Sequence, residues 1–315
     1  MNKLPTVTDD YCESLWQLVS NWDRWGIDDE RGALNLITDA KRRAAAASVT
    51  QGVAIGLGNA WPVDPAPDNP WPAAHRMMRA GDDPNYPGVP GLAVARDYIG
   101  VACHGAATSH IDALCHVFVK NRMYNGYPAT DVKSTGALRN DLRPMADGIV
   151  TRGVLLDIPR LHGVPYLGGD VRIGCEDLER ACATQQVDVE SGDVLIVHKG
   201  RERRKATEGA FDPGQAGLAG LHPECALWLK KKNVAVLGSD GMNDPQPNWP
   251  AAQHWPIPIH YLGICGMGMT LLHNLETERL ARHCESLGRY HFMLTVAPLK
   301  VPGATGSPTN PVALF

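Results

Sequence analysis

One short stretch, residues 103–116, constrains the fold of this chain more than any other part of it. It reads CHGAATSHIDALCH and places His110, Asp112 and His116 within seven residues, between apolar segments. If the stretch is extended, His110 and Asp112 point to the same face, because side chains alternate along a strand. If it is helical, these two point apart, and Asp112 shares a face with His116 instead. Only the extended form gives a close pair of ligands, and we expect a strand here.

The His110–Asp112 pair has two explanations. Imidazole and carboxylate groups are common ligands for zinc, manganese and iron, and neither is often buried without a partner. The pair is therefore either part of a metal site or a hydrogen-bonded pair that stabilises a loop. The spacing alone does not separate these two possibilities.

The segment SHIDALCHV resembles the signature HxGTHxDxPxH of the cyclase family of metal-dependent hydrolases, which includes kynurenine formamidases and isatin hydrolases. His110, Asp112 and His116 fall on its second histidine, its aspartate and its last histidine. The first histidine of the signature falls on Ala106. The resemblance implies metal ligation by His110 and Asp112, and the alanine favours one divalent ion, Mn or Zn, over two.

Other motifs of the same family follow in order along the chain. The segment WGIDDERGALN, from Trp25 to Asn35, resembles a WGxxDExGxxN motif, and GRYHFMLTVAPLKVPGATGSPTNP resembles the family's C-terminal end. The resemblance therefore runs from about residue 22 to residue 315. It makes Trp25 and Asn35 candidates for binding the substrate, although a structural turn explains them equally well.

Two further histidines are selected by the resemblance. Relatives carry a P-x-H segment, followed about a dozen residues later by a polar side chain before Asn-Leu, and these places hold His260 and His273. The later position is a metal-binding Glu in formamidases and a Ser in isatin hydrolases, so His273 is either a metal ligand or an acid–base group. We assign His273 to the metal and His260 to catalysis. The histidines without a spacing partner are expected to be structural: His75, His162, His198, His222, His254, His283 and His291.

The predicted secondary structure mixes strands and helices. Apolar, β-branched stretches predict buried strands at 152–158, 192–200, 234–237 and 292–296, and helices are expected at 10–20, after Thr38, and at 175–186. The order is too irregular for a Rossmann fold or a TIM barrel, and no P-loop or GxSxG motif occurs. The resemblance instead implies a single α/β domain over residues 1–315, of the swivelling β/β/α type, with a mixed sheet and flanking helices. The proline-rich residues 61–90 are expected to form a long irregular excursion.

Composition limits the partners. With 315 residues, 44% of them hydrophobic, the chain can bury a large core, and its net charge of -4 provides no basic field for nucleic acid or a membrane surface. We expect a small-molecule substrate. The eight cysteines lack a CxxC pair, and no signal segment or apolar run of membrane-spanning length occurs, which predicts free thiols in the cytoplasm. The resemblance adds a homo-oligomer, either a dimer or a tetramer.

The function implied by the resemblance is hydrolysis. A metal-activated water would attack the carbonyl of a cyclic amide, lactone or N-formyl substrate, and His116 would act as general base, a contribution of roughly 10² to 10⁴ in rate. The tryptophans of the N-terminal half indicate an aromatic or cyclic substrate. Two alternatives stay open: a metal-dependent cyclase or lyase that acts by proton abstraction, and a non-catalytic protein that binds a metal or ligand.

Overall fold

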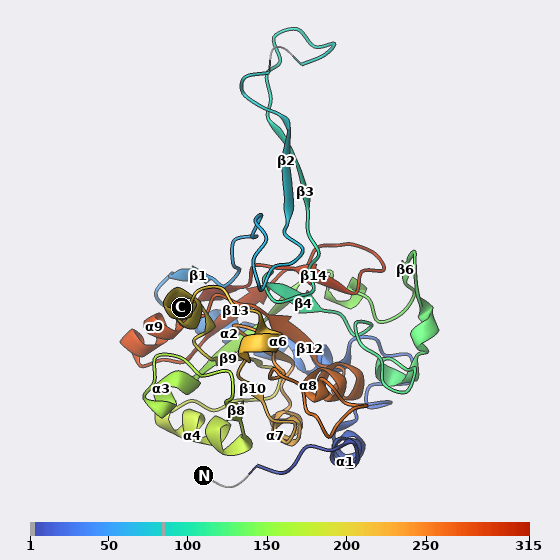
Figure 1. The fold of residues 1–315 in the computed structure, drawn as a ribbon, viewed down its shortest axis with the longest axis vertical. Helices are drawn as coiled ribbons and strands as arrows, with labels where there is room; N and C mark the ends of the chain where they lie inside the picture. Colours follow the sequence, from blue (N-terminus) through green and yellow to red (C-terminus); the bar gives the residue numbers. More distant parts are fainter. Residues whose placement is uncertain (1–3, 84–85) are drawn as a thin grey trace.

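A nine-stranded mixed sheet forms the centre of the protein (Figure 1). The structure is a computed structural model that describes residues 4–83 and 86–315. In spatial order the strands are β1 (Ala54–Gly56), β15 (Val312–Leu314), β13 (His291–Val296), β7 (Ile149–Asp157), β9 (Val194–His198), β11 (Val236–Ser239), β12 (Thr270–His273), β4 (His110–Asp112) and β14 (Gly306–Pro308). Both ends of the sheet are built from strands far apart in the sequence.

The four central strands β7, β9, β11 and β12 are parallel, and all other neighbours in the sheet are antiparallel. The carboxyl ends of the parallel strands therefore meet at one edge, which is where α/β proteins usually bind ligands. At this edge β4 lies antiparallel to β12, and His110 is directly opposite His273 in the register. Directly opposed residues have neighbouring side chains, so the sheet itself brings these two histidines together.

Helices cover the sheet and fill the connections between its strands. Helices α2, α4 and α9 all contact β7 in the middle of the sheet. The α-helices are α1 (Asp9–Val19), α2 (Asp39–Ala47), α3 (Ile158–His162), α4 (Cys175–Gln185), α5 (Arg201–Glu208), α6 (Pro213–Ala216), α7 (Cys225–Lys232), α8 (Pro258–His260) and α9 (Glu278–Leu287). A π-helix, η5 (Tyr261–Met267), continues α8, and the 3-10 helices are η1 (Gly32–Leu36), η2 (Tyr124–Gly126), η3 (Ala129–Asp131) and η4 (Arg143–Met145). Small two-stranded sheets pair β2 (Ala74–Arg79) with β3 (Arg96–Gly100), β5 (Val132–Lys133) with β6 (Gly136–Ala137), and β8 (Arg172–Ile173) with β10 (Gly220–Leu221).

Local sequence explains many of these elements. Helix α2 begins after Thr38, whose hydroxyl accepts a hydrogen bond from the backbone N–H of Lys41 and so satisfies one free donor of the first turn. Strand β13 alternates strictly, with Phe292, Leu294 and Val296 buried and the residues between them partly exposed. Strand β9 is buried at every position, as expected for a central parallel strand.

The predicted α/β class, with a mixed sheet and flanking helices, is confirmed. The strands expected around residues 152–158, 192–200 and 292–296 and the helix at 175–186 are present as β7, β9, β13 and α4. All eight cysteines are free thiols. Within residues 4–83 and 86–315, no helix is both long enough and apolar enough to cross a membrane.

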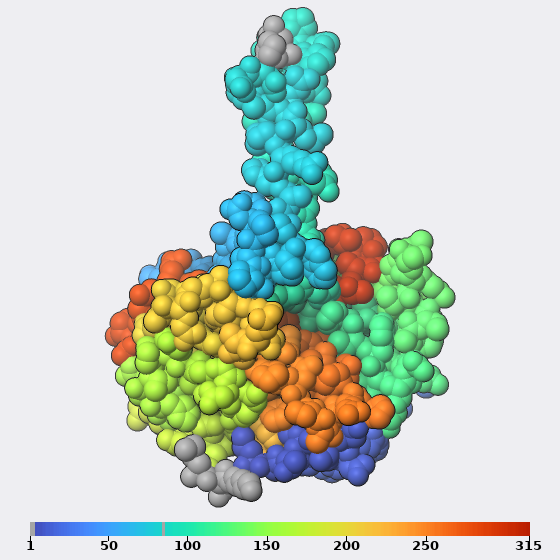
Figure 2. All heavy atoms as spheres, viewed as in Figure 1, coloured from blue at the N-terminus to red at the C-terminus, as the bar shows by residue number. Residues whose placement is uncertain are grey.

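Residues 61–90 were expected to be irregular throughout, but the structure contains a strand within them. Residues 74–79 form β2, which pairs with β3 in a β hairpin that projects from the body of the protein (Figures 1 and 2). The prolines of the excursion flank the six residues of β2 and do not interrupt them, so the strand can form. The stretch from 61 to 73 remains without helix or ladder strand and lies at the base of the hairpin.

Candidate functional site

A single buried carboxylate, that of Asp112, lies at the centre of a group of histidines. Its Oδ1 atom faces three imidazoles: His104 Nδ1 at 3.0 Å, His110 Nε2 at 3.5 Å and His116 Nε2 at 4.0 Å. The Nδ1 atom of His110 makes a hydrogen bond with the backbone oxygen of Thr108 at 2.8 Å, which directs the other ring nitrogen at Asp112. The rings of His104 and His116 are stacked, with centroids 3.9 Å apart.

The Oδ2 atom of Asp112 faces two more imidazoles. His273 Nε2 lies at 2.9 Å and His260 Nε2 at 3.8 Å, and these two rings are also stacked. His260 is held from behind by Asp244, which accepts hydrogen bonds from its Nδ1 at 2.5 Å and from its backbone N–H at 3.0 Å. A carboxylate behind a histidine fixes the ring orientation and the tautomer, as is usual for histidines that bind metal. On the Nδ1 side of His273 lies the backbone oxygen of Gly241, at 3.4 Å.

The environment determines the charges in this cluster. Burial lowers the pKa of His110 to about 3 and that of His116 to about 4, so both rings are neutral near pH 7. Burial alone would raise the pKa of Asp112, but the imidazoles around it hold this pKa well below its ordinary value. Burial disfavours the charged form of His104 as well, yet the adjacent Asp112 carboxylate raises the pKa of that ring to about 10. The centre of the cluster is thus an ionised carboxylate that attracts a cation.

The donor atoms fit a divalent metal ion. His104 Nδ1 and Asp112 Oδ1 lie 3.0 Å apart, yet neither buried atom makes a hydrogen bond of acceptable geometry with any described residue. Two groups of three ligand atoms, each group within 4.8 Å, are present: His104, His110 and Asp112, and Asp112, His260 and His273. Imidazole nitrogen with carboxylate oxygen is a donor set that suits zinc and manganese. A metal ion at this point would bind the imidazole nitrogens and the carboxylate oxygens in place of the protons that they share.

The cluster opens into a cavity of about 370 Å³. Its wall combines the histidines with two charged residues, a few other polar residues and several apolar side chains. The lining residues are His104, Gly105, Ala106, His110, His116, Arg201, Asp212, Pro213, Gly214, Leu218, Met242, Gln246, Ile257, His260, His273 and Asn274. A small molecule that enters this cavity reaches the histidine cluster.

The structure brings together five of the residues selected from the sequence, which are His110, Asp112, His116, His260 and His273. The other two lie elsewhere. Asn35 donates to Asp29 Oδ1 at 2.7 Å, and Trp25 lies under the guanidinium of Arg24. Neither Trp25 nor Asn35 lines the cavity.

Two residues of the cluster were not selected from the sequence. The signature places its first histidine at Ala106, but His104, two residues earlier, supplies the imidazole. The presence of His104 only six residues before His110 could have marked it as a candidate, but the spacing of the signature points to position 106 instead. Asp244, in the loop after β11, has no spacing relation to His260 that a local pattern could reveal.

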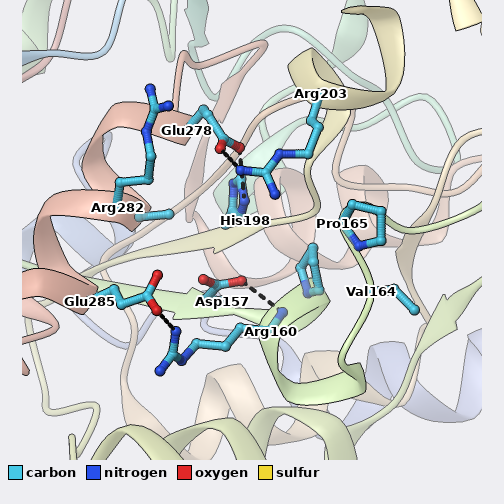
Figure 3. A pocket seen from close by; sticks show the side chains of 11 residues that line it. Asp157, Arg160, Val164, Pro165, His198, Arg203, Glu278, Arg282 and Glu285 are labelled. Carbon is cyan, nitrogen blue, oxygen red and sulfur yellow. Dashed lines mark hydrogen bonds and ion pairs between the residues drawn. The ribbon is translucent and has the colours of Figure 1, made fainter. Parts of the chain in front are cut away.

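A second cavity, of about 190 Å³, lies at the carboxyl ends of β7 and β9 (Figure 3). Four of its charged side chains form ion pairs: Arg160 with Glu285, and Arg203 with Glu278. The buried ring of His198 is held by Thr277 Oγ1 at 2.7 Å. This cavity shares no lining residue with the first one, and neither group of ligand atoms found in the described chain lies in it. The chemistry of the histidine cluster therefore belongs to the first cavity.

The protein is thus an α/β protein with a buried aspartate among histidines at one edge of a mixed sheet. The family is identified by sequence: a model described as "Putative cyclase" matches residues 48–243, and the chain belongs to this Cyclase family. A comparison with curated protein sequences gives no significant match.

Solved structures share the fold. A crystal structure described as a novel cyclase is 28% identical, with a TM-score of 0.82 over 94% of this chain and 100% of that one. Isatin hydrolase A from Labrenzia aggregata is 18% identical, with a TM-score of 0.59 over 90% of this chain and 99% of that one. A protein from Bacillus stearothermophilus described as a "predicted metal-dependent hydrolase" is 15% identical, with a TM-score of 0.52 over 84% and 98%.

Proposed function

We propose that this protein is a metal-dependent hydrolase that cleaves a C–N or C–O bond in a cyclic amide, lactone or N-formyl substrate. The observation that carries the proposal is the buried Asp112 carboxylate, which faces imidazoles on both oxygens at the end of an accessible cavity. Membership of the Cyclase family and the descriptions of two structural relatives as an isatin hydrolase and a metal-dependent hydrolase support it.

The ion would be held by Asp112, because this residue belongs to both groups of ligand atoms. His110 and His273 complete the set that the sequence predicted, and His104 and His260 extend it on the two sides of the carboxylate. We assign His260 to ligation and not to proton transfer, since Asp244 holds its Nδ1 and directs its Nε2 at Asp112. When bound, a Zn or Mn ion supplies Lewis acidity, which polarises a carbonyl and lowers the pKa of water from about 15.7 towards about 7.

His116 is the proposed general base. Its ring lines the cavity, 26% of its side chain is exposed, and burial lowers its pKa to about 4, so the ring is neutral near pH 7 and keeps a nitrogen lone pair. In hydrolysis a water oxygen forms a bond with the carbonyl carbon, while the bond to the leaving nitrogen or oxygen breaks. His116 takes the proton from the water and passes it to the leaving atom, a contribution of roughly 10² to 10⁴ in rate.

The proposal is tested by elemental analysis of the purified protein beside its Asp112→Ala and His110→Ala variants. We expect Zn or Mn in the wild type and little in either variant, and the ratio of metal to chain measures whether one ligand group or both are filled. His75→Ala is the matched control, because His75 lies on the projecting hairpin, where its ion-pair partner among the described residues is Asp97. A wild type without metal after growth with added Zn and Mn contradicts the proposal.

We also propose that the protein is a homo-oligomer. The projecting hairpin exposes large apolar side chains, among them Met78 (66%), Tyr98 (55%) and Ile99 (55%). A two-stranded hairpin alone in water is marginally stable, and a second copy of the chain would cover these side chains. Light scattering should give a dimer or tetramer for the wild type and a smaller species for a Met78→Glu/Ile99→Glu double variant. A monomeric wild type contradicts this assignment.

A further inference from the structure

Arg201 lies in the wall of the cavity that holds the histidine cluster. It is the first residue of α5, and only 2% of its side chain is exposed. Its Nη2 donates to the backbone oxygen of Ala106 at 2.6 Å, within the loop that joins His104 to His110. Its Nη1 donates to Asn274 Oδ1 at 3.1 Å, next to His273 in the sequence. The guanidinium is thus wedged between the two segments that carry the histidines.

The hydrogen bonds of this guanidinium are incomplete. A guanidinium has five N–H donors, and the described residues accept three hydrogen bonds from it: at Asn274 Oδ1, Asp68 Oδ2 and the oxygen of Ala106. The Nε atom is buried without an acceptor among the described residues. A buried donor without an acceptor destabilises a protein unless something else satisfies it.

Arg201 shares its ion-pair partner with a second cation. Its ion-pair partner in the described chain is Asp68, at 3.0 Å, and the same carboxylate atom accepts a second ion pair from Lys205, also at 3.0 Å. Two cations therefore share one carboxylate. Asp212 lines the cavity too, but its carboxylate caps α6 by accepting the N–H of Gly214 at 2.8 Å. Arg201 therefore shares its carboxylate partner with Lys205, which also faces Glu202 at 4.0 Å.

The remaining wall indicates what else a ligand must have. Leu218, Met242 and Ile257 contribute apolar surface to the same cavity. A ligand that fits would have an apolar body and an anionic group, such as a carboxylate, that accepts a hydrogen bond from the guanidinium.

We propose that Arg201 recognises a carboxylate on the substrate, at a position other than the carbonyl that reacts. This inference rests on the proposed hydrolase function and narrows it to acyl compounds that have an apolar body and a free carboxylate. Arg201 is then a specificity-determining residue that binds the substrate and takes no part in bond cleavage.

The test uses two probes of the same shape, benzoate and benzamide, which differ in charge. Their affinities are measured by calorimetry on the full-length protein as purified, with equal metal content in all variants. Any contribution of the metal to benzoate binding is present in wild type and variants alike, so it cancels in the comparison. We expect Arg201→Met to weaken benzoate binding about 10- to 100-fold and to change benzamide binding about twofold or less. Equal losses for both probes, or no loss for benzoate, overturn the inference.

A second variant keeps the test decisive if Arg201→Met folds poorly. Asp68→Asn removes the carboxylate that competes with a ligand for Arg201, so benzoate should bind several-fold more tightly and benzamide with unchanged affinity. A purely structural role for Arg201 predicts no such gain. Benzoate affinity that does not rise in Asp68→Asn therefore contradicts the inference. Arg203→Met is the matched control, because Arg203 lies on the same helix but lines the other cavity. Arg203→Met should leave the affinities for benzoate and benzamide unchanged. If it weakens benzoate binding as much as Arg201→Met does, the inference is contradicted.

Binding of the probes requires no turnover, which separates this inference from the proposed function. A protein that prefers benzoate through Arg201 but hydrolyses no acyl compound refutes the hydrolase and retains the anion site. A protein that hydrolyses neutral and carboxylate-bearing substrates equally well refutes the anion site alone.

Discussion

Replacement of Asp244 by Asn tests whether His260 is held in place for a metal ion. Asp244 is buried and accepts three hydrogen bonds: from the backbone N–H of Ile259 at 2.8 Å, from the backbone N–H of His260 at 3.0 Å, and from His260 Nδ1 at 2.5 Å. An Asn side chain has the same shape but a single acceptor oxygen. In either orientation of the amide, its NH₂ group lies against N–H donors of residue 259 or residue 260, so at least one hydrogen bond is replaced by two donors that face each other.

The size of the effect follows from these contacts. The hydrogen bond between a carboxylate and a histidine contributes about 1.5–3 kcal/mol, and its loss leaves the ring of His260 free to rotate or to change tautomer. Since 1.4 kcal/mol corresponds to a factor of ten in affinity, we expect metal affinity to fall about 10- to 100-fold. His273 and Asp112 remain in place, so binding is weakened and not abolished.

The assay is a metal titration against a competing chelator, with circular dichroism to establish that each variant is folded. Asp157→Asn is the matched control: Asp157 is also a buried carboxylate at the end of a central strand, but it accepts the N–H of Arg160 and faces the other cavity. A folded Asp244→Asn protein with the metal affinity of the wild type refutes the role assigned to Asp244, as does an equal loss in Asp157→Asn.

Three further predictions address other parts of the structure. His104→Ala should weaken metal binding about tenfold or more in the same titration, and an unchanged affinity would exclude His104 from the site. Burial lowers the pKa of Lys199 from 10.5 to about 8, so between these two pH values the unfolded chain binds more protons at this residue than the folded chain does. In urea titrations the free energy of unfolding of the wild type, relative to that of Lys199→Met, should therefore rise by up to about 3 kcal/mol from pH ~8 to pH ~10.5. A gain of the opposite sign would contradict the burial argument. Gly153→Ala should lower the free energy of unfolding by about 1–3 kcal/mol because its methyl group meets the ring of Phe292, whereas Gly81→Ala, in open space, should be neutral; equal effects would contradict this packing.

Local sequence signals predicted the parts of the fold that depend on local interactions. The capping hydroxyl of Thr38 marks the start of α2, and apolar β-branched runs mark β7 and β9. The period of two in a strand also predicted the pairing of His110 with Asp112, which the extended β4 presents on one side of the sheet. Each of these features is determined by residues within one turn or one strand.

The rest of the site depends on contacts between distant segments. His273 faces His110 because β12 and β4 are neighbours in antiparallel register, which no local pattern encodes. Asp244 reaches His260 across a loop of the C-terminal half, and His104 occupies the place that the signature spacing gives to Ala106. The resemblance of residues 25–35 to a family motif made Trp25 and Asn35 candidates for binding the substrate, but a sequence motif does not say which way a segment faces, and neither residue lines the cavity.

The most direct test of the hydrolase is the source of oxygen in its product. The metal-containing enzyme is incubated with lactones, cyclic amides and N-formyl arylamines, with and without a carboxylate, in water enriched in oxygen-18. The masses of the products are then measured by mass spectrometry. The account predicts that the new acid carries one oxygen from the solvent, and that the reaction is lost in Asp112→Ala and after treatment with a chelator. A product without solvent oxygen, or full activity in Asp112→Ala, would contradict metal-dependent hydrolysis at this site.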